Sequence, residues 1–128
     1  MKNYFALLLP LLGLDALWLG LVAKNFYRKY LGYLMAEKFL LWPAAIFYLL
    51  YAFGLLVFAL LPALQERSVW GAVWRGALLG LIAYGTYDLT NQATMAKWPL
   101  IVTVVDLAWG ALVSAIVCAA AYYLVTKI

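Results

Sequence analysis

Histidine is absent from this chain of 128 residues, and cysteine occurs once, as Cys118. The absence of histidine excludes a Ser-His-Asp triad, imidazole ligation of a metal ion and histidine ligation of haem. A single cysteine excludes a disulfide within the chain, and an apolar run around Cys118 favours a small packing role. Any enzyme chemistry must therefore rest on aspartate, tyrosine, lysine or cysteine.

Charged residues are also scarce, at 11% of the chain, whereas 70% of the residues are hydrophobic. Soluble domains keep about a quarter of their residues charged, so this balance predicts a membrane protein. The net charge is +4, but the nine basic residues fall in short loops and at segment ends. That pattern is typical of snorkelling anchors and lipid-headgroup contacts. We therefore expect membrane lipids as partners and no nucleic acid.

Four apolar windows are long enough to cross a hydrocarbon core, which needs about 20 residues. They are Tyr4–Ala23, Phe39–Leu61, Val69–Thr90 and Leu100–Val125. The prediction is an all-α integral membrane four-helix bundle, formed as a single domain over residues 1–128. Short connections place both termini on one side of the membrane. Basic residues are almost equally divided between the two sides, so the orientation stays open.

The segment between the first two windows, KNFYRKYLGYLMAEKF, mixes aromatic and basic residues. One interpretation is an ordinary belt of aromatic and basic residues at the membrane surface. The other is a short helix lying in the interface, since Phe26 and Tyr30 recur at helical spacing. The two interpretations are compatible.

Three aspartates lie within the apolar windows: Asp15, Asp88 and Asp106. A charged aspartate at the centre of a membrane helix costs about 2.5–3.5 kcal/mol, so each must be paired, hydrated or protonated. Counting residues along each helix places all three in the half of the membrane away from the termini. We expect them to converge there, and an intramembrane acid is by default a functional-site hypothesis.

Small and polar residues form one stripe on each of the last two predicted helices, which indicates that these helices face each other. The stripes comprise Gly76, Gly80, Tyr84, Tyr87 and Asn91 on one helix, and Thr103, Asp106, Gly110 and Ser114 on the other.

The stretch YDLTNQAT, residues 87–94, ends the third window. Part of its polarity marks a helix end, and Asn91 suits a structural role and a binding role equally well. Trp18 and Trp109 share helix faces with Asp15 and Asp106 and are either packing residues or substrate platforms. The predicted substrate-binding residues are Asp15, Trp18, Tyr84, Tyr87, Asp88, Thr90, Asn91, Asp106 and Trp109.

The residues YDLTN, then Ala93-Thr94, Trp98-Pro99, Asp106 and Trp109-Gly110 occur at fixed spacing, with Leu14-Asp15 and Trp18 upstream. With this motif the chain resembles an uncharacterised family of small bacterial four-helix integral membrane proteins, a domain of unknown function. The resemblance covers nearly the whole chain and implies a multi-pass protein of the bacterial inner (cytoplasmic) membrane. It implies no activity. It does imply a connection with lipids, because genes of such a family tend to lie near genes for fatty-acid modification.

Three functions are compatible with these residues. The first is a protein that handles a lipid or an amphipathic small molecule in an Asp/Asn/Tyr pocket, with basic loop residues holding an anionic headgroup. The second is a proton-coupled transporter that uses Asp15 and needs a homodimer to form a path. The third is a structural subunit of a membrane complex. Mg²⁺ bound by carboxylates is chemically reasonable, but the residues assign no cofactor, metal ligand or catalytic group.

Overall fold

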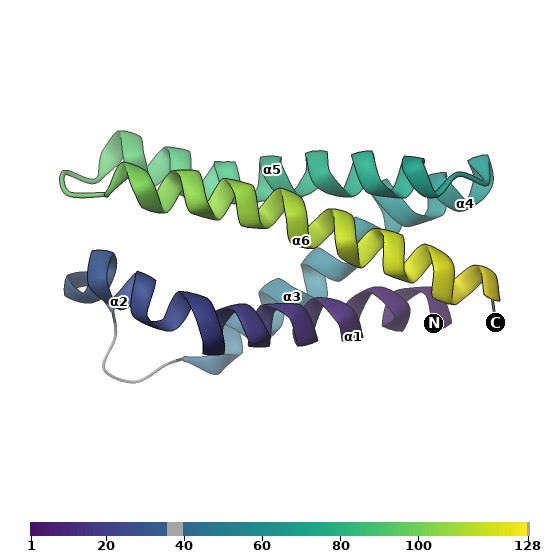
Figure 1. Cartoon of the computed structure of the whole chain (residues 1–128), viewed down its shortest axis with the longest axis horizontal. Helices are drawn as coiled ribbons and strands as arrows, with labels where there is room; N and C mark the ends of the chain where they lie inside the picture. Colours follow the sequence, from purple (N-terminus) through teal and green to yellow (C-terminus); the bar gives the residue numbers. More distant parts are fainter. Residues whose placement is uncertain (36–39, 128) are drawn as a thin grey trace.

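The computed structural model describes residues 1–35 and 40–127, and these form helices and no strands (Figure 1). Phe39, the first residue of the second predicted window, lies outside the described ranges. In chain order the elements are α1 (Lys2–Leu17), the π-helical segment η1 (Trp18–Ala23), α2 (Lys24–Leu31), the 3₁₀ turn η2 (Gly32–Leu34), α3 (Leu41–Leu55), the π-helical segment η3 (Leu56–Leu60), α4 (Leu61–Glu66), α5 (Val69–Thr94) and α6 (Leu100–Lys127).

Several elements join end to end, so four helical rods make the fold. Lys2–Leu34 is one continuous helix of 33 residues and Leu41–Glu66 is another of 26 residues. These two and α6 are long and apolar enough to cross a membrane. α5 is equally long, with 26 residues, but is less apolar, so its crossing stays a prediction. The all-α membrane bundle expected from the sequence is confirmed.

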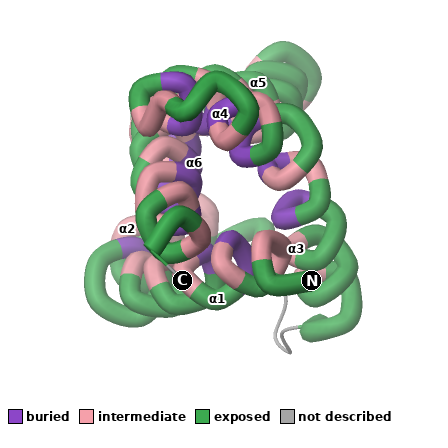
Figure 2. Tube along the Cα trace, turned by 90° about the vertical axis from the view of Figure 1, so that its right-hand side faces the viewer, coloured by how far each residue is buried: buried purple, intermediate pink, exposed green. Residues whose placement is uncertain are grey.

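The four rods surround a common axis in the order α1, α3, α5 and α6, and their buried residues face inward (Figure 2). The most extensive contact is between α5 and α6, and α6 also packs along α1. α3 packs on α1, whereas contact between the second rod and α5 is made mainly through η3 and α4. The first part of α3 therefore stands away from α5.

Glycines allow the close approach of α5 and α6. A side chain at Gly80 would lie 2.6 Å from Ser114 Oγ and would overlap the carbonyl of Gly110. Small residues at such positions let membrane helices pack backbone against backbone. The two stripes predicted from the sequence therefore face each other over Gly76, Gly80 and Tyr84 on α5 and Gly110 and Ser114 on α6.

The two ends of the bundle differ in what they bury. We call the end with both termini and the turn at Arg67-Ser68 the terminal half, and the end with α2 and the loop 95–99 the polar half (Figure 1). The terminal half buries an apolar core that includes Leu7, Leu11, Leu60, Ala63, Val117 and Ala121. The polar half buries Asp15, Asp88, Thr103 and Asp106.

The turn in the terminal half is closed by local chemistry. Arg67 ends α4 with φ 56°, in the left-handed region, and Ser68 Oγ accepts a hydrogen bond of 3.2 Å from the Gly71 amide at the start of α5. Across the turn, the Arg75 guanidinium donates two hydrogen bonds to the Glu66 carboxylate, and the one from Nη1 to Oε2 is 2.9 Å long. The guanidinium also lies over the ring of Trp74. This reversal sets α5 antiparallel to the second rod.

Candidate functional site

Asp15, at the end of α1, is a carboxylate with a donor on each oxygen. Tyr48 of α3 donates its hydroxyl to Oδ2 at 2.5 Å, and Trp109 of α6 donates its indole N–H to Oδ1 at 2.9 Å. Only 6% of Asp15 is exposed. Because charge-assisted hydrogen bonds offset the loss of solvent, these two donors stabilise Asp15 inside an apolar bundle and tie three helices together.

Asp106 lies on α6 and is 7% exposed. The hydroxyl of Tyr27, on α2, donates to Asp106 Oδ1. Tyr27 was not among the residues predicted from the sequence. α2 continues α1 within the single helix Lys2–Leu34, and this contact turns the Tyr27 ring toward α6. The position of α2 relative to the membrane surface stays a prediction.

Asp88, on α5, is fully buried, and among the described residues neither of its carboxylate oxygens has a hydrogen-bond donor. The carboxyl of Asp106 lines the same cavity, and of two neighbouring carboxyl groups one takes up a proton more readily than usual. A buried charge without a partner is costly. Asp88 therefore requires either a proton or a cation from outside the chain.

Aromatic rings surround these acids. The indoles of Trp18 and Trp109 are stacked, with centroids 4.4 Å apart and planes 8° apart. Tyr84 lies against Gly110, where an added side chain would overlap the Tyr84 ring. The acids thus lie among rings from η1, α2, α3, α5 and α6, and no basic side chain of the described residues lines their cavities.

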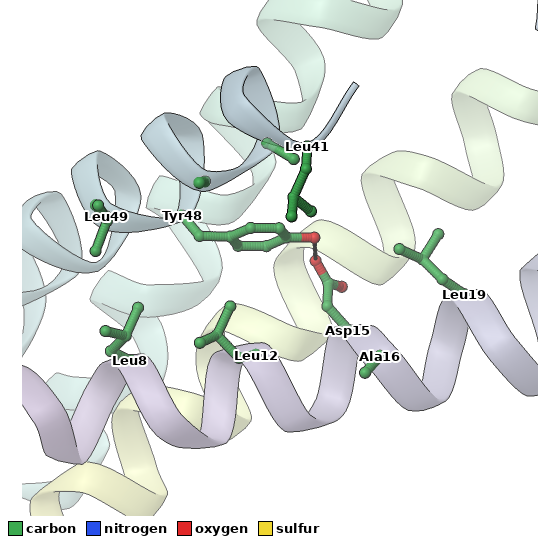
Figure 3. Close-up of a pocket in the computed structure, with 10 residues that line it drawn as sticks. Leu8, Leu12, Asp15, Ala16, Leu19, Leu41, Tyr48 and Leu49 are labelled. Atoms are coloured by element: carbon green, nitrogen blue, oxygen red, sulfur yellow. Dashed lines mark hydrogen bonds between the residues drawn. The ribbon is translucent and has the colours of Figure 1, made fainter. Parts of the chain in front are cut away.

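Three adjoining cavities contain the site. The apolar groove lies between α1 and α3, has a volume of about 440 Å³ and is lined by Leu8, Leu12, Asp15, Ala16, Leu19, Leu41, Ala44, Ala45, Tyr48 and Leu49 (Figure 3). The aromatic cavity, of about 260 Å³, is lined by Asp15, Trp18, Leu19, Tyr27, Leu31, Met35, Tyr48, Tyr84, Tyr87, Asp106 and Trp109. The Asp88 cavity, of about 340 Å³, is lined by Tyr27, Phe47, Ala83, Tyr84, Tyr87, Asp88 and Asp106.

The cavities share walls. Asp15 and Tyr48 line both the apolar groove and the aromatic cavity. Tyr27, Tyr84 and Asp106 line both the aromatic cavity and the Asp88 cavity. Figure 3 shows the Tyr48–Asp15 hydrogen bond within the groove, with Leu8, Leu12 and Leu49 on one side of it and Leu19 on the other. The apolar groove therefore adjoins the aromatic cavity, and the aromatic cavity adjoins the Asp88 cavity.

No lysine or arginine of the described ranges lines any of the three cavities. The described residues also hold no group of three or more Asp, Glu or Cys side chains close enough to share a metal ion. The arrangement offers carboxylate oxygens, aromatic faces and the indole N–H of Trp18, which has no acceptor among the described residues. Its chemistry is that of hydrogen-bond acceptance and cation attraction.

Of the nine residues predicted to bind substrate, seven line the aromatic cavity or the Asp88 cavity. Thr90 and Asn91 line none of the three cavities. Thr90 is exposed and its hydroxyl donates to the carbonyl of Thr86, one turn back on α5. A binding role for these two residues stays a prediction that the cavities do not support.

Part of the YDLTNQAT…WP motif has a structural role at the α5–α6 turn. The Trp98 indole donates to Thr103 Oγ1 at 3.1 Å, Thr103 donates to Gln92 Oε1 at 2.8 Å, and Gln92 donates to the Trp98 carbonyl at 2.9 Å. This closed set of hydrogen bonds fixes the loop between the two helices. It also accounts for the spacing of Gln92 from Trp98.

The sequence pattern did not predict a role for Tyr27, because residue counting assumes regular α-helix geometry. Tyr27 lies 12 positions after Asp15, which in an unbroken α-helix places it about 120° around the axis. The π-helical segment Trp18–Ala23 lies between them, and its wider turns rotate each residue by less than an α-helix does. This underwinding brings Tyr27 back toward the face of Asp15.

Tyr48 was missed for another reason: the second window carries no charge, so nothing marked it as polar. A role for Tyr48 could have been predicted from Asp15, which needs hydrogen-bond donors inside the bundle. In a chain without histidine, the tyrosine hydroxyls of an uncharged helix are among the few such donors. Tyr51, one turn further, makes a buried hydrogen bond of 2.5 Å with Ser114.

Comparisons with known proteins address the identity of the chain. Searches among curated proteins and among solved structures return no match. A family model described as "Predicted membrane protein (DUF2177)" matches residues 1–123. This description agrees with the three apolar helices in indicating a multi-pass membrane protein. Because the match spans nearly all of the 128 residues, the chain belongs to the DUF2177 family of predicted membrane proteins.

Proposed function

We propose that this protein binds a membrane amphiphile, with the alkyl chain in the apolar groove and the polar head in the aromatic cavity. The observation that carries the proposal is the shared wall of the two spaces. Asp15 and Tyr48 line the groove and at the same time line the aromatic cavity. A ligand that fills both spaces must be apolar along most of its length and polar at one end.

The groove suits an alkyl chain. Apart from Asp15 and Tyr48 its lining consists of leucine and alanine. Its volume of about 440 Å³ falls within the range of about 300–1,000 Å³ that is usual for small-molecule sites. Leu12, Leu41 and Leu49 are exposed at its rim, so in a membrane the groove opens toward the lipid tails and is accessible from the side.

Transport coupled to protons is a second candidate, favoured by the carboxyl of Asp88. The sequence assigned the exchangeable proton to Asp15, but Asp15 already accepts from Tyr48 and Trp109. Asp88 has no donor among the described residues. In a mechanism that exchanges ligand for proton, Asp88 is therefore the better carrier.

Filling the groove tests the primary proposal. A dodecyl amphiphile that carries a photoreactive diazirine near the middle of its chain should label α1 and α3 of the wild-type protein in maltoside micelles. Leu12→Trp should abolish most of this labelling, because the indole occupies the groove. Labelled peptides are quantified by mass spectrometry.

Leu9→Trp is the matched control. Leu9 lies on the same helix, is 64% exposed and does not line the groove, so its replacement should leave labelling unchanged. Equal labelling of the wild type and both variants would mean that the probe only coats the outer surface, and the proposal would be wrong.

A further inference from the structure

We propose that the polar end of the site selects a cationic head, specifically an alkylated ammonium group, held among Asp15, Asp88 and Asp106. This inference deepens the proposed function and rests on it, since the groove must first hold the chain of the ligand. It concerns the charge of the head, which the groove itself does not determine.

The first argument is charge. Three carboxyl groups line the aromatic cavity and the Asp88 cavity, and no basic side chain of residues 1–35 and 40–127 joins them there. In the low dielectric of a membrane bundle each charge interacts strongly with a head placed beside it. An anionic head would be repelled. Basic loop residues, which the sequence suggested as partners of an anionic headgroup, do not line these cavities.

The second argument is the unpartnered carboxyl. Three donors near the acids serve the other two carboxyls, since Tyr48 and Trp109 donate to Asp15 and Tyr27 donates to Asp106. Asp88 is fully buried, lines its cavity and has no donor in the described part of the chain. A bound cation in that cavity would supply the missing positive charge, as buried charges require.

The third argument is the aromatic wall. Rings of Trp18, Trp109, Tyr27, Tyr48, Tyr84 and Tyr87 line the same space. Aromatic faces attract cations, and aromatic cages combined with acids recognise quaternary ammonium groups. A quaternary ammonium has no N–H donor, so it suits a site that offers ring faces and carboxylate charge.

A neutral hydroxylated head is the alternative with the most support, because a hydroxyl could donate to Asp88. Such a head could also accept a hydrogen bond from the Trp18 indole N–H, which lines the aromatic cavity and has no acceptor among the described residues. A hydroxylated head leaves the charge of the carboxyl groups unbalanced, whereas a cationic head balances it, and on this ground we favour the cation.

Three probes with one chain length separate the possibilities: dodecyltrimethylammonium, dodecyldimethylamine N-oxide and dodecanoate. The amine oxide has nearly the shape of the ammonium probe but no net charge at neutral pH. Each probe is titrated into the protein and the diazirine amphiphile in dodecyl maltoside micelles before irradiation. The decrease in labelling of the groove as the probe concentration rises gives the affinity of the probe. We expect the ammonium probe to bind about tenfold more tightly than the amine oxide, and dodecanoate to bind most weakly.

Asp88→Asn should reduce the preference for ammonium over amine oxide to about threefold or less, while the amine oxide itself still displaces the label. Glu66→Gln is the matched control: it removes one negative charge from a carboxyl that lines none of the three cavities, and it should leave the tenfold preference intact. Thermal unfolding of both variants shows whether they are folded.

The outcomes distinguish the two proposals. Equal displacement by the ammonium and amine oxide probes, or stronger displacement by dodecanoate, would overturn the cationic head and leave the groove assignment standing. If no probe displaces the label and Leu12→Trp does not reduce it, the groove assignment itself fails. A preference that persists in Asp88→Asn and disappears in Glu66→Gln would also refute the inference, because the charge would then act from outside the site.

Discussion

The terminal half and the polar half of the bundle are built from the same helices but are packed differently. In the terminal half, leucine, valine and alanine side chains of all four rods meet without solvent, as at Leu7, Leu55 and Val117. In the polar half the same rods carry aspartates and large aromatic residues, and three cavities remain between them. One end therefore stabilises the bundle and the other end is available for a ligand.

This contrast follows from the membrane setting. Lipid tails are as apolar as leucine, so helices associate through close packing and polar contacts. The terminal half supplies close packing. The polar half supplies hydrogen bonds between distant parts of the chain, such as Trp109 to Asp15, and these position side chains without filling the space between the helices.

The largest expected effect comes from breaking the contact between α5 and α6. Gly80→Val would force a side chain against the Gly110 carbonyl and Ser114, and backbone atoms cannot move aside as side chains can. We expect a loss of about 3 kcal/mol in the free energy of unfolding, measured by circular dichroism during titration of mixed micelles with dodecyl sulfate. Gly13→Val is the control, because no atom lies within 4 Å of a side chain at Gly13. Equal losses for the two variants would contradict the close contact.

A smaller effect on stability is expected from shortening two neighbouring leucines, one in the packed core and one in the groove. Leu11 is fully buried in the core, whereas Leu12 is 41% exposed and lines the apolar groove. Leu11→Ala should cost about 2 kcal/mol because it leaves a cavity. Leu12→Ala should cost much less, because lipid or detergent can occupy the vacated space. If Leu12→Ala is as destabilising as Leu11→Ala, the groove is closed in the folded protein.

The smallest effect is expected from the acids themselves. Asp15→Asn should lose about 1 kcal/mol, because an amide can accept from only one of the two donors and turns its own N–H groups toward the other. Asp88→Asn should lose nothing and gain slightly, since it removes a buried charge that has no donor among the described residues. The same unfolding titration compares the two. A larger loss for Asp88→Asn would show that Asp88 has a partner in the folded protein.

Much of the site was predictable from helical periodicity. Counting residues placed Asp15, Asp88 and Asp106 at similar depth, and the structure brings them to adjoining cavities. The facing stripes of α5 and α6 were predicted from the spacing of Gly76, Gly80 and Gly110. Thr90 and Asn91 were included because they continue the motif, but the cavities end before them.

Tyr27 and Tyr48 were not predictable in the same way. The position of Tyr27 depends on a π-helical segment, which changes the residue count per turn and has no clear signature in local composition. The role of Tyr48 depends on which face of α3 turns toward α1. That choice depends on packing over the whole helix, since leucines and aromatic residues occur on every side of α3.

The sequence by itself determined the class of this protein. Long apolar segments must form helices in a membrane, because every backbone N–H and C=O has to be satisfied within its own segment. It also determined that buried acids would need partners. Only the tertiary structure decided which side chains became those partners, and that Asp88 received none within the described residues. The reason is geometric: hydrogen bonds between helices depend on the rotation of each helix about its axis, and that rotation is set by contacts along the entire bundle.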